Sequence, residues 1–413
     1  MEPKLRFPEF NSNWTHDNLE NVAEIFDGTH QTPLYTKTGV QFVSVENIED
    51  IYKSEKYISH EEYDKYKNKP QINDILMTRI TAGVIGETAM VTKDVPLAYY
   101  VSLALIRCEK LFPSYVEKYI HSIQFRKELY KRIIHTAFPK KINLGDIGKC
   151  LVGITNEQEQ QKIAEFLSTI DTVIEKQKET VSAWEERKKG VMQKLFSQEV
   201  RFKADDGSEF PKWKEKKLGD ICAPLTYGMN TAAVKYDGEN KYIRITDIDD
   251  ESHLYKNNEL VSPEGELDDK YLVSENDILL ARTGASVGKS YLYDKKDGKL
   301  YYAGFLIKAH VKSENSKFIF YQTLTDRYAR WVQVTSMRSG QPGINANEYS
   351  EFMMYVPCLT EQQKIADCLS SLDEVIKKQK ATLAAWEELK KGLLQQNNQN
   401  AGCRILRFPS FYI

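Results

Sequence analysis

An internal duplication is the feature that most constrains how this chain can fold. The hexapeptide Glu159–Ala164, with the sequence EQQKIA, returns unchanged as Glu361–Ala366. Further along, Ser182–Glu186 (SAWEE) matches Ala384–Glu388 (AAWEE). Because repetition at a fixed spacing indicates one structural plan used more than once, each half of the chain is expected to fold in the same way.

Weaker matches extend the repeat upstream, and its first segment occurs three times. The paired segments are Phe42–Ile48 with Tyr242–Ile248, Asn73–Arg79 with Asn276–Arg282, and Ile142-Asn143 with Ile344-Asn345. The opening Leu5–Phe10 (LRFPEF) is echoed by Val200–Phe202 (VRF) and by Leu406–Phe411 (LRFPSF). Two similar halves can be related by a pseudo-twofold axis, as in a dimer. The order therefore predicts a circular arrangement of variable unit, helix, variable unit and helix.

The two most similar segments are predicted to be long helices with a coiled-coil seam. The first is expected to begin near Asn156, with Glu159 completing a capping box, and the second near Thr360, with Gln363 in that role. From there the seam positions alternate at spacings of four and three. The first seam is Ile163, Leu167, Ile170, Ile174, Gln177, Val181, Trp184, Lys188, Val191 and Leu195. The second is Ile365, Leu369, Leu372, Ile376, Gln379, Leu383, Trp386, Lys390 and Leu393.

Polar residues recur at matching seam positions, Gln177 with Gln379 and Lys188 with Lys390. A lone polar residue in such a seam fixes its register. The matched sets favour antiparallel pairing of the two helices with each other. The alternative is that each helix packs only on its own domain.

The variable units are expected to be mixed and strand-rich. Gln41–Val45 and Tyr291–Tyr293 are β-branched and aromatic runs typical of strands. Tyr115–Ile134 and Phe318–Val334 have apolar spacing compatible with helices. The predicted fold class is α+β, with two mixed α/β domains separated by two long antiparallel helices.

Charge is distributed in a repeated order although the net charge is only −2. Acidic residues dominate Glu46–Asp64 and Asp247–Asp269, whereas Lys110–Cys150 carries a net charge of +6 and Lys308–Arg338 a net charge of +4. Solvated surface alone could explain one such segment. Their recurrence indicates basic surfaces suited to a polyanion.

Several classes of protein are disfavoured by the composition. The six cysteines are scattered without a C-x-x-C pair, so reduced, buried thiols are expected in place of disulfides or a zinc site. The chain contains no apolar run long enough to span a membrane, and Met1–Phe10 carries no apolar core of a signal peptide. We therefore expect a cytoplasmic protein with no membrane association and no bound metal.

The sequence lacks the motifs of a methyltransferase and of a phosphate-binding loop, although one segment resembles such a loop. Gly284–Ser290 (GASVGKS) is one residue short of a phosphate-binding loop, and the strand-like Tyr291–Tyr293 follows it where such a loop requires a helix. Thr81–Glu87 in the first half has no lysine. A glycine-rich β-turn is expected at Gly284–Ser290 in place of a site for ATP.

Both helical segments, together with the LRFPEF motif and Trp14, closely resemble the conserved regions of Type I restriction–modification specificity subunits. The resemblance covers the whole chain in organisation and is specific in the helices. One departure is a Lys-Ala-Asp-Asp insertion after Phe202. This family implies a non-catalytic subunit with two target-recognition domains, each of which reads one half of a bipartite double-stranded DNA site.

The same resemblance implies partners and boundaries. Two adenine-N6 methyltransferase subunits would dock on the helices, and restriction (motor–nuclease) subunits would join them. S-adenosylmethionine, ATP and magnesium would belong to those partners, with no cofactor in this chain.

The length of each predicted helix fits a spacer between two half-sites. A helix of roughly 32 residues is about 48 Å long, compatible with half-sites about 34–36 Å apart. The expected segments are recognition domain 1 at 1–154, spacer helix 155–199, recognition domain 2 at 200–356, spacer helix 357–397, and a tail at 398–413.

Base-reading residues are expected in polar loops within the basic half of each variable unit, because bases are read by side chains at their edges. The candidate segments are His135–Lys141 and Ser336–Gln341, which precede the matched Ile-Asn pairs and differ completely in side chain. Solvated loop charge is the alternative for each residue. The DNA-binding candidates are Arg79, His135, Lys140, Lys141, Arg282, Lys289, Ser336, Arg338 and Gln341.

Two other functions remain open at this point. A self-sufficient nuclease or methyltransferase would require the motifs that are missing. A coiled-coil adaptor that binds only proteins would leave the recurring basic segments unexplained.

Overall fold

The computed structural model describes residues 5–395 and 406–407 and divides into two units. Unit 1 comprises Met1–Glu179 and Ala381–Ile413, and unit 2 comprises Thr180–Lys380. The described residues nearest to both ends of the chain therefore belong to unit 1, as a circular arrangement requires. Each of the two long helices, α5 (Glu157–Phe196) and α10 (Leu359–Gln395), contributes one part to each unit.

In the two largest sheets of unit 1, residue alternation decides what each face contacts. The larger sheet has the order β3-β10-β6-β8, and the smaller has the order β5-β4-β9. Ile75 and Met77 of β6 join the core formed with α2 and α3, whereas Leu76 between them joins a second core with the smaller sheet. Successive side chains of a strand point to opposite faces, so one strand serves both cores.

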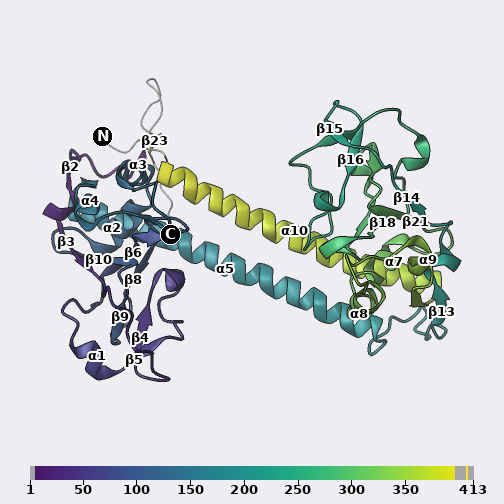
Figure 1. Ribbon diagram of the computed structural model, residues 1–413, viewed down its shortest axis with the longest axis horizontal. Helices are drawn as coiled ribbons and strands as arrows, with labels where there is room; N and C mark the ends of the chain where they lie inside the picture. Colours follow the sequence, from purple (N-terminus) through teal and green to yellow (C-terminus); the bar gives the residue numbers. More distant parts are fainter. Residues whose placement is uncertain (1–4, 396–405, 408–413) are drawn as a thin grey trace. The chain divides into compact units, whose positions relative to one another are not determined.

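The elements of unit 1 follow one another in this order along the chain (Figure 1). The strands before the helices are β1 (Leu5–Arg6), β2 (Thr15–Asn18), β3 (Ala23–Asp27), β4 (Val40–Val43), β5 (Tyr57–Ile58), β6 (Ile75–Thr78), β7 (Ile80–Thr81), β8 (Thr88–Met90), β9 (Leu97–Tyr99) and β10 (Leu103–Cys108), with the short helix α1 (His60–Asp64) after β5. They are followed by α2 (Pro113–Ile120), α3 (Ile123–Arg132), β11 (Lys140–Lys141), α4 (Leu144–Gly148) and β12 (Leu151–Ile154).

Unit 2 repeats this topology. Its larger sheet has the order β14-β21-β18-β19, and β16 pairs with β20 in parallel, as β4 pairs with β9. Ile278 and Leu280 of β18 face α7 and α8, whereas Leu279 faces the β16–β20 layer. The predicted duplication therefore extends from the sequence to strand order, strand direction and the division of the core.

The elements of unit 2 carry the following bounds. The first part contains β13 (Lys214–Lys217), α6 (Leu218–Ile221), β14 (Thr226–Tyr227), β15 (Ala233–Lys235), β16 (Lys241–Ile243), β17 (Val261–Pro263), β18 (Asp277–Ala281), β19 (Ser290–Leu292), β20 (Leu300–Tyr302) and β21 (Leu306–His310). The second part contains α7 (Ser316–Gln322), α8 (Asp326–Thr335), α9 (Ala346–Ser350) and β22 (Met353–Val356).

The regions predicted as helical in each variable unit each contain two helices. Ser122 caps α3 by accepting a hydrogen bond from the backbone N–H of Phe125, and Thr325 caps α8 in the same way through Tyr328. A hydroxyl that satisfies a free N–H of the first turn favours a new helix start there. The breaks therefore occur at matching points in the two units.

Asn156 caps α5 as predicted, but the Glu159 carboxylate bonds to Arg6 and Thr155 and does not complete a capping box. Asn156 Oδ1 accepts a hydrogen bond from the backbone N–H of Glu159 at 2.9 Å.

The residue before α10 lies two positions before the predicted cap, and the predicted partner Gln363 bonds to Asn315 and Asp367 instead. Helix α10 begins at Leu359, so Thr360 lies inside its first turn and does not cap it. Cys358 occupies the place before that helix, and the Gln362 N–H bonds to its carbonyl at 3.0 Å.

The third copy of the opening motif lies beside the first. The parallel strands β1 and β23 (Leu406–Arg407) pair in register, Leu5 with Leu406 and Arg6 with Arg407. Phe408–Phe411 of the predicted repeat and the expected tail at 398–405 lie outside the described residues.

Candidate functional site

Two loops of equal length occupy matching places in the two units. In unit 1 the Ile134 N–H donates to the Lys141 carbonyl at 2.8 Å, which closes an eight-residue loop after α3. In unit 2 the Gly343 N–H donates to the Ser336 carbonyl at 3.1 Å, which closes an eight-residue loop after α8. We name these segments reading loop 1 (134–141) and reading loop 2 (336–343).

Each reading loop is tied to the residues that follow a central strand. The Ile142 N–H donates to the Arg79 carbonyl at 3.0 Å, and the Ile344 N–H donates to the Arg282 carbonyl at 2.9 Å. In unit 1, Lys140 and Lys141 also form β11 against β7. The common frame holds the base of each loop and leaves its tip free to vary.

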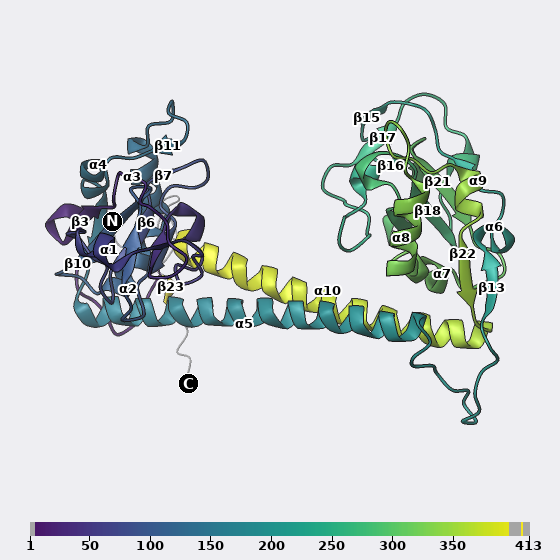
Figure 2. The same ribbon diagram turned by 60° about the horizontal axis from the view of Figure 1, so that its bottom comes forward.

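The tip of reading loop 1 combines cations with an aromatic ring. His135, Lys140 and Lys141 are exposed, and Phe138 is 92% exposed. The His135 ring lies against the ring of Tyr130, with centroids 4.5 Å apart. Figure 2 shows the loop beside β11 projecting from unit 1.

The tip of reading loop 2 carries different chemistry on the same frame. Met337, Arg338 and Gln341 are exposed. The Arg338 guanidinium contacts Glu348 of α9 and the carbonyls of Thr335 and Met337. The loop therefore offers amide and guanidinium donors where reading loop 1 offers two lysines and a phenyl ring.

Three of the nine predicted DNA-binding residues are not available at the surface. Arg79 is buried, and its Nη1 lies 3.4 Å from Asp27 Oδ1. The side chain of Lys289 is almost covered and pairs with Asp250 and the Ile248 carbonyl. Ser336 is buried at the base of reading loop 2. Arg79 and Lys289 pair with neighbours distant in sequence, and Ser336 is covered, so the structure does not support the prediction for these three residues.

The remaining six candidates are solvent-accessible to different degrees. Arg282 is half-buried, with its guanidinium over the Tyr227 ring at 4.9 Å and its Nη1 bonded to the Gly304 carbonyl. The other five lie in the two reading loops. Tyr130, which is 68% exposed beside His135, was missed, because an exposed ring on a helix leaves no mark in the apolar spacing.

The long helices are seated on each unit by a repeated ion pair. Arg6 donates twice to the buried Glu159, through Nε and Nη2 at 2.8 Å each. Arg201 donates twice to the buried Glu361, at 3.0 and 2.7 Å. Such a two-pronged pair fixes orientation as well as distance. It explains why the arginine of the opening motif and the first glutamate of EQQKIA recur together.

The next residue of the hexapeptide joins each helix to its domain. Gln160 accepts a hydrogen bond from the Phe112 N–H at 2.9 Å and donates to the Thr155 carbonyl at 2.7 Å. Gln362 likewise accepts from the Asn315 N–H at 2.9 Å and donates to the Pro357 carbonyl at 2.9 Å. The glutamine amide thus bridges a β-strand end and the start of the α2 or α7 helix.

Within each unit the two helices pair in an antiparallel sense. In unit 2, Lys188 contacts Asp373 at 2.5 Å and Glu185 contacts Lys380 at 2.7 Å. Residue numbers that rise along α5 therefore meet residue numbers that fall along α10. In unit 1, Leu167, Ile170 and Ile174 pack with α10 residues. Those residues are Leu383, Trp386, Leu393 and Leu394.

The seam lysines have specific partners. Lys390 contacts Asp171 at 2.6 Å in unit 1, as Lys188 contacts Asp373 in unit 2. These aspartates were missed, although both follow a seam position and both recur in the repeat. The remaining seam positions in the described chain are buried or half-buried, including Gln177 and Gln379.

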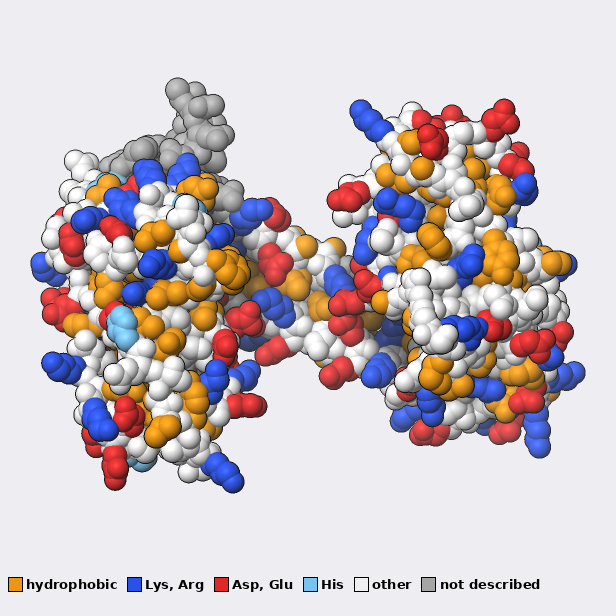
Figure 3. Space-filling model, viewed as in Figure 1, with side chains coloured by type: hydrophobic (Ala, Val, Ile, Leu, Met, Phe, Trp, Pro, Cys, Tyr) orange, Lys and Arg blue, Asp and Glu red, His pale blue; other side chains and the backbone are white. Residues whose placement is uncertain are grey.

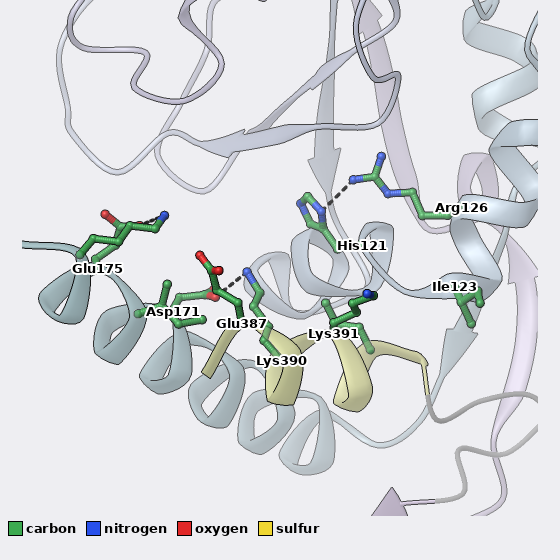
Figure 4. A pocket seen from close by; sticks show the side chains of 11 residues that line it. His121, Ile123, Arg126, Asp171, Glu175, Glu387, Lys390 and Lys391 are labelled. Atoms are coloured by element: carbon green, nitrogen blue, oxygen red, sulfur yellow. Dashed lines mark hydrogen bonds and ion pairs between the residues drawn. The ribbon is translucent and has the colours of Figure 1, made fainter. Parts of the chain in front are cut away.

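A cleft of about 510 Å³ opens beside this contact in unit 1 (Figure 4). Its lining carries both signs of charge, with Lys390 directed at Asp171 and the Arg126 Nη2 2.9 Å from His121 Nδ1. The lining residues are His121, Ile123, Arg126, Asp171, Ile174, Glu175, Lys178, Glu387, Lys390, Lys391 and Leu394. The positive and negative side chains of the lining offset one another, so the cleft has no concentration of charge of one sign such as a catalytic site would use.

Comparison with known proteins identifies the family to which this duplicated architecture belongs. A model of the Type I restriction modification DNA specificity domain matches residues 11–182 and again residues 211–385. This chain belongs to the Type I restriction–modification specificity family. Its two matched segments are therefore target-recognition domains, and specificity subunits of these systems are non-catalytic.

One relative and one solved structure of specificity subunits span almost the whole chain, and a second relative spans part of it. A putative Type I restriction enzyme MjaX specificity subunit of Methanocaldococcus jannaschii is 23% identical over 95% of this chain and 94% of its own length. The MjaVIII specificity subunit of the same organism is 24% identical over 57% of the chain and 58% of its own length. The S subunit from M. genitalium shares the fold, with a TM-score of 0.61 at 17% identity, covering 97% of this chain and 100% of its own.

The glycine-rich segment in the second target-recognition domain is a turn. Gly284–Ser286 forms a short 3-10 helix, and strand β19 follows it. Among residues 5–395 and 406–407, no cluster of three metal-ligating side chains occurs, and no helix is long and apolar enough to cross a membrane.

The cysteines of this specificity-family chain are unpaired wherever the structure describes them. Cys150 and Cys222 are buried, as expected, and burial raises the pKa of each thiol to about 12. Cys108, Cys358 and Cys368 are only half-buried, which corrects the expectation of burial for these three. Cys403 lies outside the described residues.

Proposed function

We propose that this chain reads a bipartite double-stranded DNA target, with one half-site for each target-recognition domain, through reading loops 1 and 2. The observation that carries the proposal is the pair of eight-residue loops, closed between equivalent residues but carrying different exposed side chains. A common frame with different tips is what two readers of different sequences need. Charge alone would not identify the surface, because the face drawn in Figure 3 mixes both signs on each unit.

We further propose that α5 and α10 space the two readers and dock two adenine-N6 methyltransferase subunits, which restriction subunits join. A straight helix of 40 residues is about 60 Å long, more than the 34–36 Å or so between half-sites one DNA turn apart. A structural relative described for complex assembly of the Type I system shares the fold at a TM-score of 0.56, with 14% identity over 94% of this chain and 97% of its own.

The cofactors and compartment follow from this assignment. S-adenosylmethionine, ATP and magnesium would bind the partner subunits, because the chemistry would be theirs. The unpaired cysteines fit a reducing compartment, and we propose the cytoplasm.

The test is a salt titration of DNA binding by the complex of this chain with its methyltransferase. Lys140→Ala with Lys141→Ala should weaken binding and flatten the log–log salt dependence by about one for each phosphate that is no longer neutralised. Lys295→Ala with Lys296→Ala is the matched control, because these lysines are also adjacent and exposed. An unchanged affinity and slope in the reading-loop variant would remove the lysines from the interface.

A further inference from the structure

Phe138 is the most exposed large apolar side chain among the described residues, at 92%. It lies at the tip of reading loop 1. The hydrogen bond between Ile134 and Lys141 closes this loop, and the pairing of β11 with β7 holds its second arm. The base of the loop is therefore held while the ring projects into solvent. A phenyl ring gains nothing from this position in the free protein, because burial is what stabilises it.

The surroundings of the ring indicate what covers it. Lys140 and Lys141 follow Phe138 by two and three residues, and both side chains are exposed. His135 and Tyr130 supply a second, partly exposed aromatic pair in the same unit. An apolar tip flanked by cations complements a polyanion with an apolar interior, which describes the stacked bases of DNA between their phosphates.

We propose that Phe138 is an apolar wedge that enters the base stack of the half-site bound by unit 1, with Lys140 and Lys141 on the adjacent phosphates. The proposal rests on the proposed function. Proteins that bend DNA insert Phe, Leu, Ile, Met or Pro between base steps, and here Pro139 follows the ring directly. The equivalent position in reading loop 2 is Gly340, so unit 2 has no ring at this position of its loop.

The experiment uses the complex of this chain with its methyltransferase and a duplex carrying the target found by methylation mapping. The adenine analogue 2-aminopurine, whose fluorescence is quenched by stacking, replaces one adenine at a time. The methylated adenine of each half-site is left unsubstituted, because a methyltransferase extrudes that base itself. At the other positions we expect a several-fold rise at one step in the half-site of unit 1 and none in the other half-site. Phe138→Ala should abolish the rise and weaken binding about tenfold. Phe138→Leu should keep most of the rise, because leucine can also act as a wedge.

Leu34→Ala is the matched control, because Leu34 is 91% exposed in unit 1 but lies outside reading loop 1. It should leave the fluorescence rise unchanged, and an equal decrease there would overturn the assignment to Phe138. A rise that persists in Phe138→Ala would also overturn it.

The same measurements separate this inference from the proposed function. If the unmodified complex fails to bind the mapped duplex in preference to a scrambled one, the proposed function fails and the wedge with it. If binding is specific but insensitive to Phe138→Ala, only the wedge fails. Dissociation of the methyltransferase subunit with intact DNA binding would make Phe138 a protein contact and contradict the wedge.

Discussion

Helix α2 of unit 1 and helix α7 of unit 2 occupy equivalent places beside the long helices but present different side chains to them. Glu117 and Lys118 of α2 correspond to Phe320 and Tyr321 of α7. Lys118 Nζ contacts Asp171 at 2.7 Å, whereas the Tyr321 hydroxyl donates to Asp373 at 2.6 Å. One junction is ionic and the other is aromatic, yet both hold the aspartate that pairs with a seam lysine.

The comparison separates what the repeat fixes from what each unit chooses. The fixed part is the arginine–glutamate pair at the helix start and the aspartate–lysine pair in the seam. The variable part is the additional side chain that bonds to each of these glutamates and aspartates. Thr155 donates to Glu159 in unit 1, but the Trp213 indole donates to Glu361 in unit 2 at 3.2 Å. Only contacts between the repeated segments themselves must be kept when the domains diverge.

The strongest test of this division is the arginine–glutamate pair. Arg6→Ala and Arg201→Ala should each destabilise their own unit by about 3–5 kcal/mol, because each leaves a buried carboxylate without its cation. Hydrogen exchange in the first turns of α5 and α10 would report the two units separately. A large destabilisation in one unit and none in the other would show that the pair is not the common anchor.

Acid sensitivity should distinguish the two junctions. Although burial opposes it, contacts with His121 and Lys118 lower the pKa of Glu117 from 4.5 to about 2. A lowered pKa stabilises the folded state above pH 4.5, by about 3 kcal/mol for this shift, and that stability is lost as the pH falls from 4.5 through about 2. Phe320 does not titrate, so the helices of unit 1 should lose exchange protection in acid before those of unit 2. If Glu117→Gln leaves the acid sensitivity unchanged, Glu117 is not its source.

The smallest effect is expected at the seam lysines. Lys188→Ala and Lys390→Ala should each cost less than about 1 kcal/mol, because the pairs are partly exposed to solvent. Lys390→Ala should cost less, because Lys118 still contacts Asp171. Thermal unfolding of the two variants at one salt concentration would rank them. The reverse order would mean that Lys118 does not substitute for Lys390.

Local patterns in the sequence were enough to predict the helices, and position in the repeat was enough to locate the reading loops. The apolar spacing from Ile163 onward involves residues three and four apart, which are neighbours on one face of a helix. Such a local pattern can therefore be read without knowing the tertiary structure. The burial of Arg79 was not predictable, because its partner Asp27 is brought to it only by the sheet. The partners of Lys188 and Lys390 were missed for the same reason, since pairing across two helices depends on their register.

The sharing of each long helix between units has a consequence during synthesis. The stripe formed by Leu167, Ile170 and Ile174 is covered by α10 residues from Leu383 onward, which leave the ribosome about 200 residues later. At about 5–20 residues per second, the nascent chain carries this stripe uncovered for about 10–40 s. Anything that captures an apolar helix face, from a chaperone to a neighbouring nascent chain, therefore meets unit 1 before unit 1 can close.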